Sequence, residues 1–191
     1  MNLYEEIINI LEMKGSATIP AIWEEMNQLN SKEINNMEGI DLPSLRLMIG
    51  HKRDWFRIKG DIVSIRPERE PVKLIFHLSG YPGPEVKISI DFKRQTFILL
   101  EWRFGKHGAQ RKPNFLPGSI LEFKRELYSL NLWEWEKDYH AEGIIVDGTS
   151  WSVVLETKTT SYHSEGFESF PKQWKNLCRA LMQLTGGALR F

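Results

Sequence analysis

The first third of the chain alternates between apolar stripes at helical spacing and short polar breaks. Residues 3–14 carry apolar side chains on one face and glutamates on the other, which predicts an amphipathic helix that ends at Gly15. A second helix is predicted after Thr18, a good N-cap residue, with Pro20 in its first turn. The two apolar stripes are formed by Leu3, Ile7, Ile8 and Leu11, and by Ile19, Ile22, Trp23, Met26 and Leu29. Residues 31–39 are polar and predict a loop.

Residues 40–67 predict a third helix followed by a β-hairpin. Asp41 is the expected N-cap, and Pro43 lies in the first turn. The hairpin turn is expected at Lys59-Gly60-Asp61, where Gly60 supplies the positive φ that such a turn needs. The expected inward positions are Leu42, Leu45, Met48 and Ile49 of the helix, and Trp55, Ile58, Ile62, Val63 and Ile65 of the hairpin.

Three helices and a hairpin in this order, with the hairpin sequence RDWFRIKGDIVSI at residues 53–65, resemble a known domain. It is the winged helix-turn-helix domain of bacterial polymerase-associated and restriction-linked proteins. The resemblance covers about residues 1–67. It implies that the third helix lies in the major groove of duplex DNA, as in other helix-turn-helix proteins.

The second domain is expected at residues 72–191, after the boundary PEREP at 67–71, where two prolines rule out a central strand. Alternating apolar residues at 72–79, 86–91 and 96–102 predict an antiparallel three-stranded meander. A helix is predicted over 118–130, and a last helix after Phe170-Pro171 that ends at Gly186-Gly187. Asp147-Gly148 predicts a hairpin between residues 144–146 and a strand at 151–158, with a further strand or loop at 159–165. The expected fold class is α+β, a winged helix followed by an antiparallel sheet with two packed helices.

Residues 147–186 are similar to the C-terminal part of small uncharacterised bacterial domains. The shared features are a DG pair, a tryptophan strand, a glycine, an aromatic-proline pair and a final helix. This resemblance implies a fold and no activity.

Composition narrows the classes of protein. The 191 residues are 41% hydrophobic, which is typical of a folded chain, and the formal net charge is zero. The single cysteine, Cys178, excludes an internal disulfide and a cysteine zinc site. No apolar run approaches the ~18 residues of a membrane span, and the acidic N-terminus lacks a signal-peptide pattern. We therefore expect a cytoplasmic protein with no membrane partner.

A basic cluster around the third helix and the hairpin is the main functional candidate. Several cations on one face are needed to bind phosphates, and one or two on the helix to read bases. The candidate DNA-binding residues are Ser44, Arg46, His51, Lys52, Arg53, Arg57 and Lys59, and Arg66 and Arg69 complete the cluster. Residues 1–70 hold nine basic and twelve acidic side chains, which disfavours DNA binding. The alternative is that the hairpin, the wing of the domain, is solvent-exposed and contacts a protein.

Asp147, Glu156 and Lys158 form a second candidate, since two carboxylates and a lysine are the pattern of a Mg²⁺-dependent restriction-type nuclease. The ordinary interpretation is a turn aspartate and the solvent face of a strand. The histidines are scattered without metal-ligand spacing, so no metal or other cofactor is expected.

The aromatic residues are a third candidate, as a platform for single-stranded nucleic acid beside the basic loop Lys106, His107, Arg111 and Lys112. The set is Trp102, Trp133, Trp135, Tyr139, Trp151 and Trp174. An aromatic core is the favoured interpretation, with Trp133 and Trp135 partly exposed as a partner-binding edge.

Together these patterns indicate a non-enzymatic DNA-binding adaptor or regulator whose C-terminal domain binds a protein partner or forms a homodimer. The alternatives are the nuclease and a protein-interaction module, such as an immunity or defence accessory, that binds no DNA.

Overall fold

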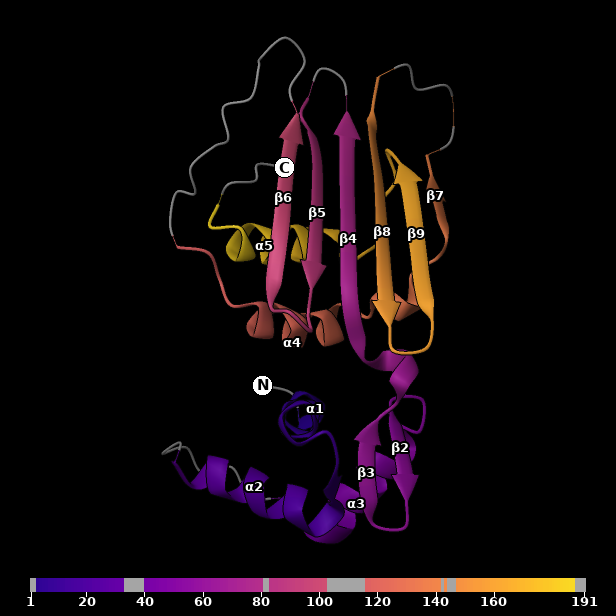
Figure 1. The fold of residues 1–191 in the computed structure, drawn as a ribbon. Helices are drawn as coiled ribbons and strands as arrows, with labels where there is room; N and C mark the ends of the chain where they lie inside the picture. The colour runs from indigo at the N-terminus through magenta and orange to yellow at the C-terminus, as the bar shows by residue number, and fades with distance from the viewer. Residues whose placement is uncertain are drawn as a thin grey trace. The chain divides into compact units, whose positions relative to one another are not determined.

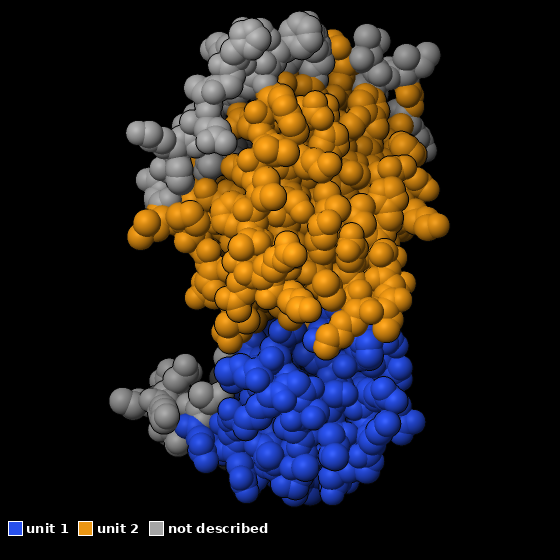
Figure 2. Space-filling model, viewed as in Figure 1, with its two compact units in different colours: residues 1–70 blue, residues 71–191 orange. Residues whose placement is uncertain are grey.

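The structure is a computed structural model that describes residues 3–32, 40–80, 83–102, 116–141, 143 and 147–187. The chain divides into two compact units, residues 1–70 and 71–191 (Figures 1 and 2). Among the described residues, no helix has the length and apolar character that crossing a membrane requires.

Unit 1 consists of helices and a small antiparallel sheet. Its elements are α1 (Leu3–Lys14), β1 (Ala17–Thr18), α2 (Ile19–Lys32), α3 (Leu42–His51), β2 (Phe56–Lys59), β3 (Ile62–Ile65) and the 3₁₀ turn η1 (Pro67–Arg69). The sheet order is β1-β3-β2. The three helices and the hairpin agree with the sequence prediction, whereas β1 has only two residues and gave no detectable alternation.

Local chemistry explains where these elements begin and end. Gly15 has a φ of +72° and its N–H donates to the Leu11 carbonyl, which ends α1. The Thr18 hydroxyl oxygen accepts a hydrogen bond from the Ala21 N–H at 3.3 Å, and this caps α2. Gly60 has a φ of +59° in the β2–β3 turn. All three predicted roles are confirmed.

The core of unit 1 differs from the predicted hairpin positions at two residues. Phe56 is 1% exposed, whereas Ile62, which we expected to face inward, is 51% exposed. In this short hairpin, Phe56 pairs with Ile65 and Lys59 pairs with Ile62, so the turn places Ile62 on the outer face. The buried side chains are Ile7, Ile8, Ile10, Leu11, Ile19, Ile22, Met26, Leu45, Ile49, Trp55, Phe56, Val63 and Ile65.

Unit 2 is built on a six-stranded sheet with the order β6-β5-β4-β8-β9-β7. Its elements are β4 (Pro71–Gly80), β5 (Glu85–Asp91), β6 (Thr96–Trp102), α4 (Ile120–Leu130), the 3₁₀ turn η2 (Leu132–Glu134), β7 (Asp138–His140), β8 (Thr149–Thr157), β9 (Ser161–Phe167) and α5 (Trp174–Leu184). The β4–β5–β6 meander is antiparallel as predicted. Residues 159–165, for which we expected either a strand or a loop, contain most of the strand β9. The sheet is antiparallel except that β7 pairs with β9 in parallel.

The hairpin predicted at Asp147-Gly148 is wrong. From Thr149 onward, β8 pairs with β4 on one side and with β9 on the other. Both edges of β8 are therefore taken by strands other than residues 144–146, which lie outside the described residues. Asp147-Gly148 leads into β8 instead of joining two neighbouring strands.

Helix α5 crosses one face of the sheet, and α4 lies by the lower ends of its strands in this view (Figure 1). Trp174 of α5 stacks on Phe76 of β4 with ring centroids 5.6 Å apart, and Phe123 of α4 stacks on Phe92 at 6.3 Å. Cys178 of α5 is buried. The opposite face carries alternating residues of β6, namely Ile98, Leu100 and Trp102, whose side chains are exposed.

Five of the six candidate aromatic residues pack against other aromatic rings, namely Trp133, Trp135, Tyr139, Trp151 and Trp174. Trp151 contacts three of the others, with ring centroids 4.7 Å from Trp174, 5.5 Å from Tyr139 and 6.1 Å from Trp135. Trp133 is 7% exposed because it stacks on Tyr128, so the predicted partner-binding edge at Trp133 is wrong. Trp102 lies on the other face of the sheet, and the loop from Lys106 to Lys112 lies outside the described residues.

Candidate nucleic-acid interface

The outward face of α3 is the first part of the candidate site. Leu45 and Ile49 are buried, and their positions on the helix leave Ser44, Arg46 and His51 exposed. Leu47, also on this face, is 64% exposed. Leu47 is three residues from Ser44 and four from His51, so these three side chains are neighbours on the helix surface, whereas Arg46 lies on another side of the helix. Apolar, hydroxyl and imidazole groups together form a mixed surface that can contact base edges.

Asp41 fixes the N-terminus of this helix. Its carboxylate accepts a hydrogen bond from the Ser44 N–H at 2.7 Å. Hydrogen bonding from Ser44, through its side chain and its backbone N–H, lowers the pKa of Asp41 from its ordinary value of 3.8. Asp41 is therefore an ionised cap at neutral pH, and it places one negative charge at the N-terminus of α3.

The β2–β3 hairpin supplies the second part. Arg57 and Lys59 alternate along β2 on the face opposite to the buried Phe56, and both side chains are exposed. Within the part of the chain that the structure describes, no ion pair holds either cation. These two residues are therefore available for phosphate contact.

Arg46 and Asp61 connect the two parts. The Arg46 Nη2 atom lies 2.9 Å from the Asp61 Oδ1 atom, and both side chains are about half exposed. The Asp61 carbonyl accepts a hydrogen bond of 2.9 Å from the Ile19 N–H at the start of α2. The tip of the hairpin is thus held to α3 by its side chain and to α2 by its backbone.

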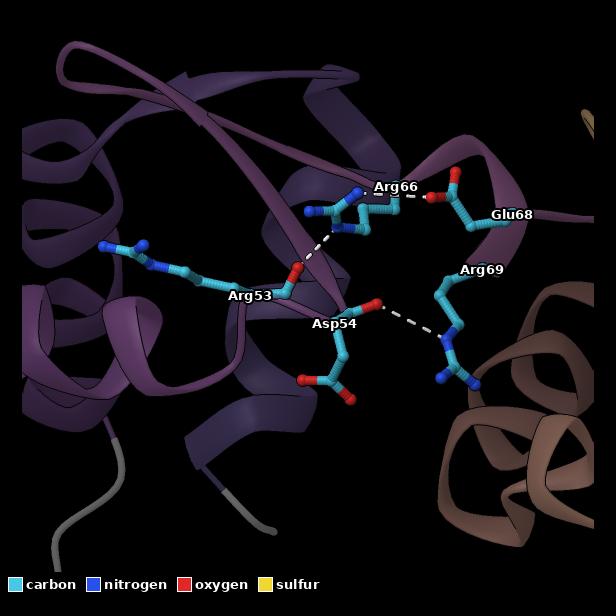
Figure 3. A network of polar contacts seen from close by, with 5 residues as sticks. All are labelled: Arg53, Asp54, Arg66, Glu68 and Arg69. Carbon is cyan, nitrogen blue, oxygen red and sulfur yellow. Dashed lines mark hydrogen bonds and ion pairs between the residues drawn. The ribbon is translucent and has the colours of Figure 1, made fainter.

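The remaining candidates are less favourably placed. Lys52 is half-buried, and its Nζ lies over the Tyr4 ring at 5.7 Å from the centroid. Arg53 has an exposed guanidinium that extends away from the neighbouring polar contacts, while its carbonyl accepts a hydrogen bond from the Arg66 Nε (Figure 3).

Arg66 and Arg69, the outer members of the predicted basic cluster, take part in structural contacts (Figure 3). Arg66 also pairs with Glu68 at 3.2 Å, and the Arg69 Nε donates to the Asp54 carbonyl at 3.4 Å. A hydrogen bond with its own backbone, assisted by Arg66, lowers the pKa of Glu68. These contacts fasten η1 to the turn that follows α3, so the two arginines position the end of the hairpin.

The three residues of the nuclease pattern do not converge. Asp147 precedes β8, whereas Glu156 lies near the far end of the same continuous strand. Seven residues of strand separate Thr149 from Glu156, or about 23 Å at the usual rise of about 3.3 Å per residue. Two carboxylates so far apart cannot share a metal whose ligand distances are ~2.1 Å. Throughout the described ranges, no three His, Cys, Asp or Glu side chains gather closely enough to hold a metal ion.

The sequence indicated the cations of this surface but not the pairing of Arg46 with Asp61, since that contact depends on how the hairpin turn meets α3. Comparison of the chain with protein-family models, with curated proteins and with solved structures finds no match.

Proposed function

We propose that unit 1 is a winged helix that binds duplex DNA, and that the chain is a non-enzymatic DNA-binding adaptor or regulator. The observation that carries this proposal is the Arg46–Asp61 contact of 2.9 Å, which joins the exposed face of α3 and the cationic β2–β3 hairpin into one surface. The element order α1-β1-α2-α3-β2-β3 and the sheet order β1-β3-β2 support the winged-helix assignment.

The charges of this surface divide into two roles. Arg57, Lys59 and Arg53 are exposed cations suited to phosphates, whereas Ser44, Arg46 and Leu47 on α3 are suited to base edges. Asp41, Asp54 and Asp61 lie among them, so the expected affinity is modest. With three phosphate contacts, a plot of the logarithm of the DNA association constant against log[salt] would have a slope of about −3.

Binding of a fluorescent 20-base-pair duplex, followed by anisotropy between ~50 and ~200 mM salt, tests the proposal. The double variant Arg57→Ala/Lys59→Ala should weaken binding and make the salt slope shallower by about 2, one for each lost phosphate contact. Lys172→Ala/Lys175→Ala removes the same charge from exposed positions of unit 2 and is the matched control. Equal binding by the two double variants would refute the assignment of this surface.

A protein partner is the second candidate for the same surface. The observation in its favour is the excess of acidic over basic side chains in residues 1–70, together with the 64% exposure of Leu47. A wild-type chain that shows no salt-dependent binding to duplex DNA would favour this function, since a protein-contact surface needs no phosphate affinity.

We propose that unit 2 forms a homodimer through β6. This strand ends the described sheet, and Ile98, Leu100 and Trp102 are 61%, 42% and 49% exposed along it. An unpaired edge with apolar side chains is prone to pair with another strand, and helix-turn-helix proteins commonly use two copies on two half-sites. Sedimentation velocity should show a dimer that Leu100→Lys dissociates and Lys175→Ala, at an exposed position of α5, leaves intact. A wild-type protein that is still monomeric at ~100 µM would refute this assignment. Its dissociation constant would then exceed ~100 µM, which corresponds to a free energy of association smaller than about 5.5 kcal/mol.

A further inference from the structure

We propose that Asp61 is a specificity-determining positioning residue, which holds the Arg46 guanidinium for base recognition and keeps it from acting as a phosphate contact. This inference rests on the proposed DNA-binding function. It starts from the observation that Arg46, the single arginine of α3, has a carboxylate partner on the hairpin, with 2.9 Å between Nη2 and Oδ1.

The carboxylate is carried by a turn that is held on both sides. Asp61 follows Gly60, whose φ of +59° sets the turn, and precedes Ile62, which pairs with Lys59 and with Thr18. The Asp61 carbonyl accepts from the Ile19 N–H at 2.9 Å. The hairpin tip is therefore a fixed support for the Arg46 side chain, unlike a hairpin attached only by its strands.

The guanidinium keeps donors for a ligand while one nitrogen contacts Asp61. Arginine has five N–H donors in a planar fork, and the Asp61 contact is made by Nη2. Nη2 carries two N–H groups, and the one that does not contact Asp61 lies parallel to the neighbouring Nε–H or Nη1–H. These two groups remain to donate to the O6 and N7 acceptors of a guanine, the commonest specific contact in the major groove. A guanidinium already held by a carboxylate also loses less side-chain entropy when it binds a base.

The same carboxylate discriminates against phosphate. A phosphate placed at Arg46 would lie close to the negative charge of Asp61, whereas a guanine edge is uncharged. Neutralising Asp61 should therefore act in opposite directions on two measurements: it should strengthen binding to duplexes of arbitrary sequence and weaken the preference for one sequence. Loss of a merely structural ion pair would change neither the affinity for arbitrary duplexes nor the preference for one sequence, because exposed pairs contribute little to stability.

The experiment begins with selection of a preferred duplex from a pool randomised over its central base pairs. Affinities for the selected duplex and for the unselected pool are then measured with wild-type protein, Asp61→Asn, Asp61→Glu and Arg46→Lys. Asp54→Asn is the matched control, since Asp54 is an exposed carboxylate of the same unit, and it loses the same charge. Thermal unfolding of each variant reports whether unit 1 keeps its fold.

Asp61→Asn is expected to bind the pool several-fold more tightly and to lower the selected-to-pool ratio about tenfold, within the range of one lost bidentate base contact. Arg46→Lys should lower the ratio similarly, because lysine lacks the planar fork. Asp61→Glu should preserve most of the ratio, and Asp54→Asn should leave it unchanged.

An unchanged ratio in Asp61→Asn overturns the inference, as does a wild-type protein for which selection enriches no sequence. In both cases the proposed function survives if binding remains salt-dependent and Arg57→Ala/Lys59→Ala still weakens it. A wild-type protein without salt-dependent duplex binding overturns the proposed function and this inference together.

Discussion

The indole Nε1 of Trp151 donates a hydrogen bond of 2.8 Å to the main-chain carbonyl of Ser169. Gly166 of β9 pairs with Trp151 of β8, and it leaves the space that this bond occupies. A Cβ atom at position 166 would lie 2.6 Å from Nε1 and 2.8 Å from the Ser169 oxygen. The glycine, the tryptophan and the segment before α5 are therefore one packing unit, which gives a physical reason for their occurrence together within residues 147–186.

Gly166→Ala should destabilise unit 2 by about 2–3 kcal/mol, because the new methyl group displaces the indole and leaves a buried N–H without its acceptor. Urea unfolding followed by tryptophan fluorescence measures the change. Gly80→Ala is the matched control in the same sheet, since its Cβ would meet its nearest neighbours at 3.4 Å, an ordinary contact distance. The packing argument would be contradicted if Gly166→Ala lowered the free energy of unfolding no more than Gly80→Ala does.

Asn131 ends α4 in the left-handed region, with a φ of 50° and a ψ of 44°. Asn131→Ala should lower the stability of unit 2 by about 1 kcal/mol, because a Cβ-bearing residue without a local polar side chain disfavours this region. Asn131→Gly should be neutral or stabilising, because glycine adopts this conformation without strain. Thermal unfolding of the pair provides the comparison, and the opposite order of stability would be inconsistent with a left-handed cap.

Asp41 should make the stability of unit 1 depend on pH in the acid range. Its pKa is lowered in the folded state by hydrogen bonds from Ser44. A depressed pKa means that the carboxylate stabilises the fold above its unfolded pKa, and that this contribution is lost as the pH falls below about 3.8 through the folded value. Asp41→Asn keeps an acceptor oxygen and should remove this part of the pH dependence. Urea titrations between pH 2.5 and 6 give the free energy of unfolding of each protein. Its dependence on pH would be the same in the two proteins if Asp41 did not contribute.

Cys178 should resist alkylation in the folded protein. Burial raises the pKa of its thiol from 9.0 to about 12, so the thiolate that reacts is scarce at pH 8. A raised pKa also means that its stabilising contribution is full below about pH 9 and is lost as the pH rises toward 12. Iodoacetamide labelling measured by mass should be slow in buffer and fast in denaturant. Fast labelling in buffer would show that α5 opens locally.

Local signals predicted unit 1 well, because caps and turns act within a few residues. Thr18, Asp41 and Gly60 have the roles that their chemistry suggests. The sequence did not predict that Phe56 is buried and Ile62 exposed. Four-residue strands are too short for alternation to decide which face is inward.

Unit 2 shows where such signals are insufficient. Asp147-Gly148 has hairpin chemistry, but β4 and β9 occupy both edges of β8, and nothing near residue 147 encodes those distant partners. The burial of Trp133 depends on its stacking against Tyr128 at the end of α4. In the candidate interface, residue type indicated the cations, whereas the tertiary fold determined that Arg66 and Arg69 serve structural contacts and that Arg46 pairs with Asp61.

The pairing of β4 with β8 sets the order in which the chain can fold during synthesis. β4 is the first strand of unit 2, but its second neighbour in the sheet is separated from it by β5, β6, α4 and β7 along the sequence. Contacts between such distant segments form slowly because a long loop must close first. Until β8 leaves the ribosome, one edge of the β4–β5–β6 meander stays unpaired and available to chaperones or to aggregation.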